Sequence, residues 1–342
     1  FGYLTPDSIM LPALFQKKGY HTTLIGKWHL GLAKQNRPNQ RGFDEFHGWL
    51  ADMMNDYWKH IRYGQYYMRK NEEKIKPVGH ATDLFTQWSI ASLKQRAKSK
   101  QPWFQFLSYN APHSPIQPPK DWVVKVKARE KGISSKRAKI VALIEHLDDG
   151  IGQVLKVVDD LKQRDNTIVV FTSDNGGQLG LGASNGPLRS GKTHVYEGGI
   201  KVCTCVRWPG RIKPGQQTDF TALTMDIIPT LADICDVPIK HEIDGRSFKK
   251  LLLEGSQEQF KHPVFYMWLQ RGTKEAMRHG DWKVLRDRPG KPFELYNIKK
   301  DPYEKTNLAE QEPKRFKEMV VAIEAHMKAA KRVPWQRPEA GK

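Results

Sequence analysis

The 342-residue sequence is poor in cysteine and in acidic residues, and it has no long apolar run. Its cysteines, Cys203, Cys205 and Cys235, are too few for a disulfide scaffold and badly spaced for a zinc site. Cys203 and Cys205 alternate along a predicted strand, and we expect both to be small core residues on one face of it. No stretch reaches the roughly 18 apolar residues of a membrane-spanning helix, so we expect no membrane span. Only 37 Asp and Glu stand against 56 Lys and Arg, and the formal net charge of +19 favours anionic partners.

The basic runs lack the features of a nucleic-acid-binding surface. Residues 94–100 and 125–139 are rich in Lys and Arg, but no nucleic-acid-binding motif and no interleaved aromatic residues accompany them. Such runs are typical of solvated helix faces and loops. We therefore expect no nucleic-acid partner, and the charge points instead to acidic carbohydrates or small anions.

Apolar residues are plentiful enough for a large core. The sequence is 39% hydrophobic and 10% aromatic, and its length allows one large domain with a smaller one attached. The chain begins at Phe1 rather than Met and shows no signal peptide. We interpret it as a piece of a longer protein whose natural start lies upstream.

Strand and helix patterns alternate over the first 250 or so residues. Continuous apolar runs at 22–25, 102–109 and 166–173 predict buried strands, and residues 138–164 carry apolar side chains at helical spacing. This alternation is typical of a parallel or mixed sheet covered on both faces. Residues 34–80 show no clear period, and we interpret them as a long irregular insertion.

The tail of the chain has a different pattern. Short apolar runs at hairpin spacing, followed by a helical pattern at 314–330, predict a small antiparallel sheet with one helix. The predicted fold class is therefore α/β, with a mixed, mostly parallel sheet between helices and a C-terminal α+β subdomain. We place the domains at residues 1–254 and 255–342.

Polar side chains follow the three predicted strands directly. Lys27 and His29 come after the first strand, His113 lies in a proline-flanked loop after the second, and Asp174 and Asn175 follow the third. In an open α/β sheet the ligand site lies beyond the carboxyl ends of the strands. We therefore expect these side chains to belong to one site.

A glycine-rich loop at 186–199 adds Lys192 to this set. Lys27 and Lys192 would bind and neutralise a tetrahedral oxyanion. His29 and His113 would orient a nucleophile or protonate a leaving oxygen, because imidazole titrates near neutral pH. This chemistry suits the transfer of a sulfate or phosphate group.

Asp174 and Asn175 offer hard oxygen ligands, which suit Ca²⁺, or less well Mg²⁺, rather than Zn²⁺. Calcium takes about six to eight oxygens, so further ligands must come from elsewhere. A metal beside the lysines would stabilise charge that develops on sulfate or phosphate oxygens. The Asp148–Asp149 pair lies inside the long helical pattern, where a solvated face is the better interpretation.

Each motif also has an ordinary structural explanation. The stretch SDNGG (173–177) has the composition of a turn, His113 can be a simple loop histidine, and Lys192 a solvated cation. The coincidence of all of them with the ends of buried strands favours a shared site. Tyr57, Trp58 and His60, within the insertion, would either line a sugar subsite or anchor a long loop.

These stretches resemble the type I sulfatases, the formylglycine-dependent sulfuric ester hydrolases of the alkaline phosphatase superfamily. GYHTTLIGKWHLG (19–31) is similar to the second signature of that family, and the likeness continues in order through RGFDEFHG, APHSP, LDDGIGQVL, TSDNGG, GPLRSGKTHVYEGGIKV and ELYNIKKDPYEKTNL. It covers nearly the whole chain. The resemblance implies the following roles: Lys27 and His29 contact the nucleophile and the sulfate, His113 and Lys192 hold the sulfate and assist the leaving oxygen, and Asp174 and Asn175 ligate calcium.

One part of the family pattern is missing. The resemblance implies a C/S-x-P-x-R motif, whose first residue becomes formylglycine, and an Asp-Asp pair on the first strand that supplies further calcium ligands, both upstream of the second signature. The sequence contains neither of them before Tyr20. Losing a covalent nucleophile can cost on the order of 10⁶ in turnover. We therefore expect little or no turnover from this chain itself, and an active longer parent that a formylglycine-generating enzyme has processed.

Three functions stay open at this point. The chain represents a sulfatase for a sulfated carbohydrate or another sulfate ester, a pseudoenzyme that binds sulfated glycans, or a phosphodiesterase or phosphonate hydrolase of the same superfamily. The basic charge fits a polysaccharide sulfate better than a small aryl ester. The resemblance also implies export to the periplasm or the extracellular space, or to the lysosome in a eukaryote.

Overall fold

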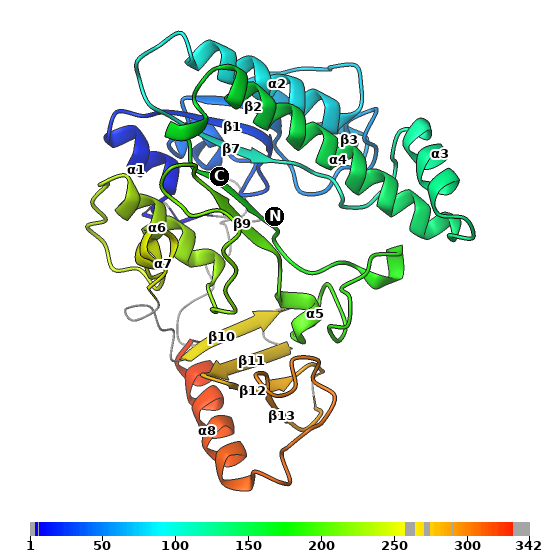
Figure 1. The fold of residues 1–342 in the computed structure, drawn as a ribbon, viewed down its shortest axis with the longest axis vertical. Coiled ribbons are helices and arrows are strands. Elements are labelled where there is room, and N and C mark those ends of the chain that lie inside the picture. The colour runs from blue at the N-terminus through cyan, green and yellow to red at the C-terminus, as the bar shows by residue number, and fades with distance from the viewer. Residues whose placement is uncertain (1–3, 6, 257–263, 270–273, 289, 331–342) are drawn as a thin grey trace. The chain divides into compact units, whose positions relative to one another are not determined.

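The computed structural model describes residues 4–5, 7–256, 264–269, 274–288 and 290–330. The chain divides into two compact units (Figure 1). Unit 1 comprises residues 1–168 and 207–256, and unit 2 comprises residues 169–206 and 257–342. The domain boundary expected between residues 254 and 255 stays a prediction.

The core of unit 1 is a mixed sheet with β1 (His21–Lys27) near its centre. The strand order is β6 (Glu73–Lys74), β5 (Met68–Lys70), β2 (Glu45–Trp49), β1 and β7 (Trp103–Ser108). Strand β1 pairs in parallel with both β2 and β7, whereas β5 runs antiparallel to β2 and β6. The predicted mixed sheet is therefore confirmed.

Apolar packing covers both faces of this sheet. Adjacent strand residues point to opposite faces, and Leu24 and Ile25 of β1 accordingly belong to two different apolar clusters. Helix α2 (Ala81–Arg96) contacts β1, β2 and β7, and α4 (Ser135–Asp160) packs on α2 (Figure 1). The five central residues of β1 are buried, so packing on both faces fixes the position of its carboxyl end.

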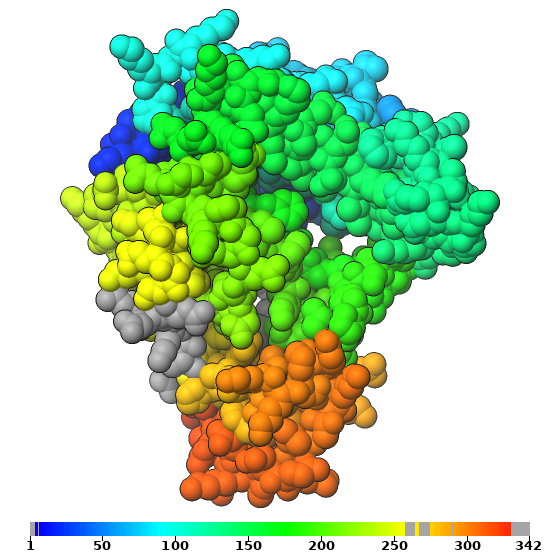
Figure 2. Space-filling model, in the orientation of Figure 1, coloured from blue at the N-terminus to red at the C-terminus, as the bar shows by residue number. Residues whose placement is uncertain are grey.

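Shorter helices complete unit 1. They are α1 (Leu11–Lys17), which contacts β1, α3 (Lys120–Arg129), α6 (Ile227–Ile234) and α7 (Lys249–Glu254). Helix α3 packs on α4, and the two form one continuous surface in Figure 2. Asp148 and Asp149 are exposed on α4, in agreement with the solvated face expected for them. No helix in the described part of the chain combines the length and apolar character needed to cross a membrane.

The interpretation of residues 34–80 as an irregular insertion was wrong. They contain β2, β5 and β6 of the central sheet and a small hairpin of β3 (Ile61–Arg62) and β4 (Gln65–Tyr66). Strand β2 has no alternating pattern because its residues are buried or half-buried on both faces. Its Gly48 also looks like a turn residue in sequence, yet a side chain there would lie 2.0 Å from the carbonyl oxygen of Gly26.

A glycine allows close packing at the end of β1. Gly26 has φ +105°, and a Cβ atom at this position would lie 2.1 Å from the carbonyl oxygen of Ser108 on β7. Only glycine fits both the backbone conformation and the space. The next residue is Lys27, so the close contact between β1 and β7 fixes the backbone directly before the candidate site.

Unit 2 contains a small antiparallel sheet, as predicted. Its strands are β10 (Val264–Leu269), β11 (Lys274–His279), β12 (Trp282–Arg286) and β13 (Glu294–Asn297), paired in chain order. Helix α8 (Pro313–Ala330) contacts β11 and β12 and buries Ile323 against Val284 in one apolar cluster. Unit 2 also contains α5 (Glu197–Ile200) and the strand pair β8 (Val169–Thr172) and β9 (Thr204–Arg207).

The expectation that Cys203 and Cys205 are core residues was wrong. Cys203 precedes β9, Cys205 lies on it, and both side chains are exposed. Among the described residues β9 pairs only with β8, on which Phe171 is itself 42% exposed. A two-stranded sheet has little apolar cover, so alternation along a strand did not imply burial here.

The half-buried histidine on β2 makes the fold sensitive to acid. His47 stacks on Trp88 of α2, and burial, assisted by the positive charge of Lys70, lowers the pKa of His47 to about 4. The unfolded chain takes up this proton near pH 6.5 and the folded chain only near pH 4, so stability is lost as pH falls through that window. The effect of this pKa shift is reduced because His47 is partly exposed. We therefore expect the decrease in the free energy of unfolding between pH 7 and pH 4 to be about 1–2 kcal/mol smaller in His47→Gln than in the wild type. Urea unfolding of both chains near pH 7 and near pH 4 measures it, and identical pH dependence would contradict the assignment.

Candidate functional site

The end of β1 is held by neighbouring strands and loops. Ser108 Oγ donates a hydrogen bond of 2.5 Å to the carbonyl oxygen of Lys27. The backbone N–H of Trp28 donates to Trp49 at 2.9 Å, and the buried indole of Trp28 donates to the carbonyl oxygen of Asn36. These contacts fix the backbone between the two predicted site residues, Lys27 and His29.

Three predicted site residues come together in unit 1. Burial lowers the pKa of His29, and the positive charges of Lys27 and His113 act in the same direction, against the carboxylate of Asp52. Lys27, His29 and His113 lie at or shortly after the ends of the adjacent parallel strands β1 and β7, whose register pairs Gly26 with Ser108. A lowered pKa keeps His29 neutral near pH 7, which leaves its ring able to accept a proton.

Buried aromatic and amide groups support the loop that carries His113. Tyr57, only 1% exposed, donates its hydroxyl to the carbonyl oxygen of His113 at 2.9 Å. The backbone N–H of Tyr57 in turn donates to Gln117 Oε1 at 2.8 Å. Tyr57 therefore anchors the loop, and of the two interpretations given for it the sugar subsite is not supported. Nδ1 of His113 donates to the carbonyl oxygen of Ser114 at 2.8 Å, because a carbonyl can only accept.

The remaining predicted residues lie together in unit 2. Asp174 and Asn175 follow β8, and the loop with Lys192 is bonded directly to the residues after them. The N–H of Lys192 donates to Gly177 at 3.1 Å, and the N–H of Gly176 donates to Gly199 at 2.9 Å. A Cβ atom at Gly176 would lie 1.8 Å from the carbonyl oxygen of Gly198. The two loops thus approach so closely that only glycine fits between them.

The loop after β8 carries metal-ligand groups that suit a hard cation. Asp174 is exposed and Asn175 half-buried, so both can be reached from solvent. Nδ2 of Asn175 donates to the carbonyl oxygen of Gly176 at 3.0 Å, which sets the orientation of the amide group. One carboxylate and one amide oxygen fit Ca²⁺ or Mg²⁺ chemistry, and they make up only part of a complete coordination shell.

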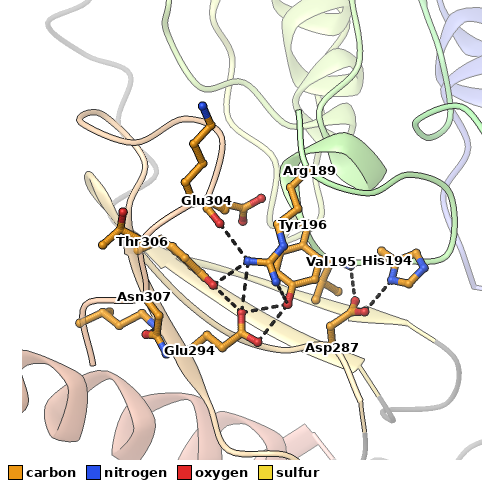
Figure 3. A network of polar contacts seen from close by, with 12 residues as sticks. Arg189, His194, Val195, Tyr196, Asp287, Glu294, Glu304, Thr306 and Asn307 are labelled. Carbon is orange, nitrogen blue, oxygen red and sulfur yellow. Dashed lines mark hydrogen bonds and ion pairs between the residues drawn. The ribbon is translucent and has the colours of Figure 1, made fainter. Parts of the chain in front are cut away.

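Residues of the antiparallel sheet of unit 2 and of its loops bind the segment that follows Lys192 in the chain; Figure 3 shows the contacts of Asp287 with His194 and Val195. Asp287 accepts hydrogen bonds from the N–H of Val195 at 3.0 Å and from Nδ1 of His194 at 2.5 Å. Lys274 on β11 donates to the carbonyl oxygen of Thr193 at 2.6 Å. The backbone beside Lys192 is therefore fixed by charged groups on the sheet.

Arg189 holds the same loop at its other end (Figure 3). Its guanidinium lies over the ring of Tyr196, 3.9 Å from the centroid, and donates to the Tyr196 hydroxyl and to the carbonyl oxygen of Glu304. The Tyr196 hydroxyl donates in turn to Glu294 on β13. Sequence reasoning missed these partners, because residues about a hundred positions apart carry no local signal of their pairing.

The comparison with known families decides the identity of the chain. The sequence model of the sulfatase family matches residues 3–237. The chain belongs to the sulfatase family. A second model, for the C-terminal part of N-sulphoglucosamine sulphohydrolase, matches residues 190–332 of this sulfatase. The resemblance expected from the motifs is thus confirmed.

Curated relatives and solved structures agree with this assignment. The sulfatase is 29% identical to a sulfatase of Formosa agariphila over 91% of this chain and 67% of that protein. It is 30% identical to human N-acetylgalactosamine-6-sulfatase over 76% of this chain and 51% of the relative. The crystal structure of i-CgsB in complex with a neocarrahexaose matches with a TM-score of 0.85 at 26% identity, over 94% of this chain and 74% of that one. The sulfatase therefore has the predicted alkaline phosphatase-like fold, and it spans about half to two thirds of these curated relatives.

Proposed function

We propose that this sulfatase hydrolyses a sulfate ester on a sulfated carbohydrate. The observation that supports the proposal is the position of Lys27, His29 and His113 at or shortly after the ends of the paired parallel strands β1 and β7, within the stretches that resemble the family motifs. Two similar proteins support the substrate class, since one is an N-acetylgalactosamine-6-sulfatase and the other is a structure in complex with a neocarrahexaose. The net charge of +19 suits a polyanionic substrate.

Each residue is proposed for one task. Lys27 and Lys192 bind sulfate oxygens and neutralise the charge that grows on them in the transition state. His29, kept neutral by burial, holds a hydrogen bond to the attacking group. His113 protonates the leaving sugar oxygen, because its imidazole can deliver a proton near neutral pH.

Asp174 and Asn175 are proposed to hold part of a Ca²⁺ shell, with Mg²⁺ the less suitable ion. When bound, such an ion would polarise the sulfate oxygens. We also propose that the reaction uses a formylglycine made by a formylglycine-generating enzyme on an exported protein. The 342-residue sequence holds no C/S-x-P-x-R motif, so we expect this chain alone to bind substrate and to release little sulfate.

Binding tests this proposal without requiring turnover. We expect Lys27→Ala and Lys192→Ala each to weaken binding of a sulfated oligosaccharide by about 10- to 100-fold, because each removes a charged hydrogen bond worth about 1.5–3 kcal/mol. Isothermal titration calorimetry measures the effect. The exposed residues Lys98 in unit 1 and Lys299 in unit 2 provide matched Lys→Ala controls that should leave the affinity unchanged.

Three outcomes would contradict the proposal. Equal losses in the control variants would show that binding depends on overall charge alone. Equal affinity for the sulfated and the desulfated oligosaccharide would show that the chain does not recognise the sulfate group. Tighter binding of a phosphorylated sugar would favour a phosphoester hydrolase of the same superfamily.

A further inference from the structure

A second group of metal-ligating side chains lies in unit 1, apart from the residues proposed for catalysis. His80 is the N-cap residue of α2, Asp83 lies in the first turn of that helix, and His146 lies on α4. One donor atom from each lies within 4.8 Å of the other two. The packing of α2 on α4 brings them together, although His80 and His146 are far apart in sequence.

The ring of His80 is held in the form that binds a metal. Its Nε2 is 3.0 Å from the carbonyl oxygen of Gln117, which can only accept, so Nε2 carries the proton and Nδ1 the lone pair. Nδ1 accepts a long hydrogen bond of 3.2 Å from the N–H of Thr82. Burial, with a further contribution from His146, lowers the pKa of His80 to about 4, so the ring is neutral near pH 7. Histidine ligands of metals commonly donate their second ring N–H to a carbonyl in this way.

His146 supplies an independent indication of a ligand. Its Nε2 is 2.6 Å from Asp83 Oδ1, so the ring donates to the carboxylate. Its Nδ1 is buried and has no hydrogen-bond partner in the described part of the chain, and the residue is only 5% exposed. Buried polar atoms are nearly always paired. This nitrogen is therefore an unused ligand atom, whose lone pair can bind a metal ion.

Aromatic rings surround the two histidines. Tyr57 and Trp58 each lie 5.1 Å from His80 between ring centroids, and Trp122 lies 5.8 Å from His146. Tyr57 is only 1% exposed, so the cluster borders on apolar surface, where electrostatic attraction to a cation is stronger than in water. Asp83 stays partly exposed, with 47% of its side chain accessible, and offers an entry path for an ion.

We propose that His80, Asp83 and His146 bind one divalent transition-metal ion, with Zn²⁺ as the best match. Two imidazoles and one carboxylate are a donor set that zinc uses, whereas calcium prefers oxygen alone. Donors of a tetrahedral zinc site are roughly 3.4 Å apart, given bonds of about 2.1 Å. The donor atoms, which lie up to 4.8 Å apart, therefore have to approach by up to about 1.4 Å. Asp83, with 47% of its side chain accessible, would exchange its hydrogen bond to Nε2 of His146 for the ion.

The ion would act on the structure around His113 rather than on a reaction. It would link α2 to α4 and fix the ring of His80, whose bond to Gln117 holds one end of the loop after β7. Gln117 also accepts from the N–H of Tyr57, which donates its hydroxyl to His113. Zinc binding would therefore stiffen the loop that positions His113, at a site separate from Asp174 and Asn175.

Titration of the chelator-treated chain with ZnCl₂ alone tests the proposal. We expect one equivalent of Zn²⁺ to bind by isothermal titration calorimetry and to raise the melting temperature by about 5 °C. Asp83→Asn and His146→Gln should each weaken binding by about 100-fold. Asp83→Asn keeps an oxygen that can accept from His146, so it tests the site even if His146→Gln does not fold. Co²⁺ in place of Zn²⁺ should give visible absorption bands that both variants lose.

Matched controls separate this site from others. His241→Gln and Asp121→Asn alter exposed residues of the same unit, and Asp174→Asn alters the proposed calcium site; all three should keep the wild-type Zn²⁺ affinity. Either of two results would overturn the proposal. In the first, the Asp83→Asn variant binds Zn²⁺ as tightly as the wild type. In the second, the wild type binds Zn²⁺ as weakly as an Asp83→Asn variant that has lost the site. The result is independent of the proposed sulfatase function, because no sulfated ligand is present.

Discussion

Lys283→Met is expected to lower the free energy of unfolding of unit 2 by about 3–5 kcal/mol, the usual cost of breaking a buried ion pair from one side. Lys283 on β12 is 0% exposed, and its Nζ lies 2.8 Å from Glu197 and 2.8 Å from Glu304. Glu304 is also 0% exposed, and burial raises its pKa against the opposing effect of Lys283. The substitution leaves two buried carboxylates without their shared cation, and urea unfolding followed by circular dichroism measures the loss.

Two further variants make this prediction specific. The triple variant Lys283→Met, Glu197→Gln, Glu304→Gln should recover much of the stability, because it removes the uncompensated charges as well as the ion pairs. Lys299→Met, at an exposed position, should change stability by less than about 0.5 kcal/mol. A loss below about 1 kcal/mol for Lys283→Met would show that the two carboxylates take up protons or water at little cost.

Gly26→Ala should destabilise unit 1 by about 2–5 kcal/mol. Two costs add: about 1–2 kcal/mol for a side chain at positive φ, and about 1–3 kcal/mol for overpacking. The overpacking arises because the new Cβ atom would lie 2.1 Å from the carbonyl oxygen of Ser108, which belongs to the strand backbone and cannot easily move. Denaturant unfolding measures the sum.

Gly19→Ala is the matched control for this variant. Gly19 also has positive φ, at +91°, but a Cβ atom there would have no neighbour within 4 Å. It should therefore show only the conformational cost, and the difference between the two variants isolates the close contact of β1 with β7. Equal losses would mean that the strands separate without penalty and that the contact does not fix the position of Lys27.

Much of the fold could be predicted because its signals are local. The apolar run of β1 is buried on both faces, whereas β7 is only half-buried and its Phe106 is 50% exposed. The hairpin spacing of β10 to β13 reflects pairing between neighbours in sequence. Strand β2 was missed for a physical reason. Its buried face contains Gly48, which serves close packing against Gly26 and resembles a turn residue when only the sequence is read.

The candidate site was predictable only in part. Lys27, His29 and His113 follow apolar strands, so their sequence positions indicate the edge of the sheet at which they lie. Their roles stay predictions, as do those of Lys192, Asp174 and Asn175. The supporting pairs had no such signal: Asp287 bonds to the loop beside Lys192, and His146 bonds to Asp83, only because distant elements pack together.

The hydrogen bonds described around the candidate residues end largely on main-chain atoms. Ser108 bonds to the carbonyl oxygen of Lys27, Tyr57 to that of His113, and the N–H of Lys192 to Gly177. A main-chain bond survives any change of side chain at the position it holds. Mutation can therefore exchange the chemical group at positions 27, 113 and 192 while the scaffold keeps its geometry, which allows one framework to diversify toward different esters during evolution or in the laboratory.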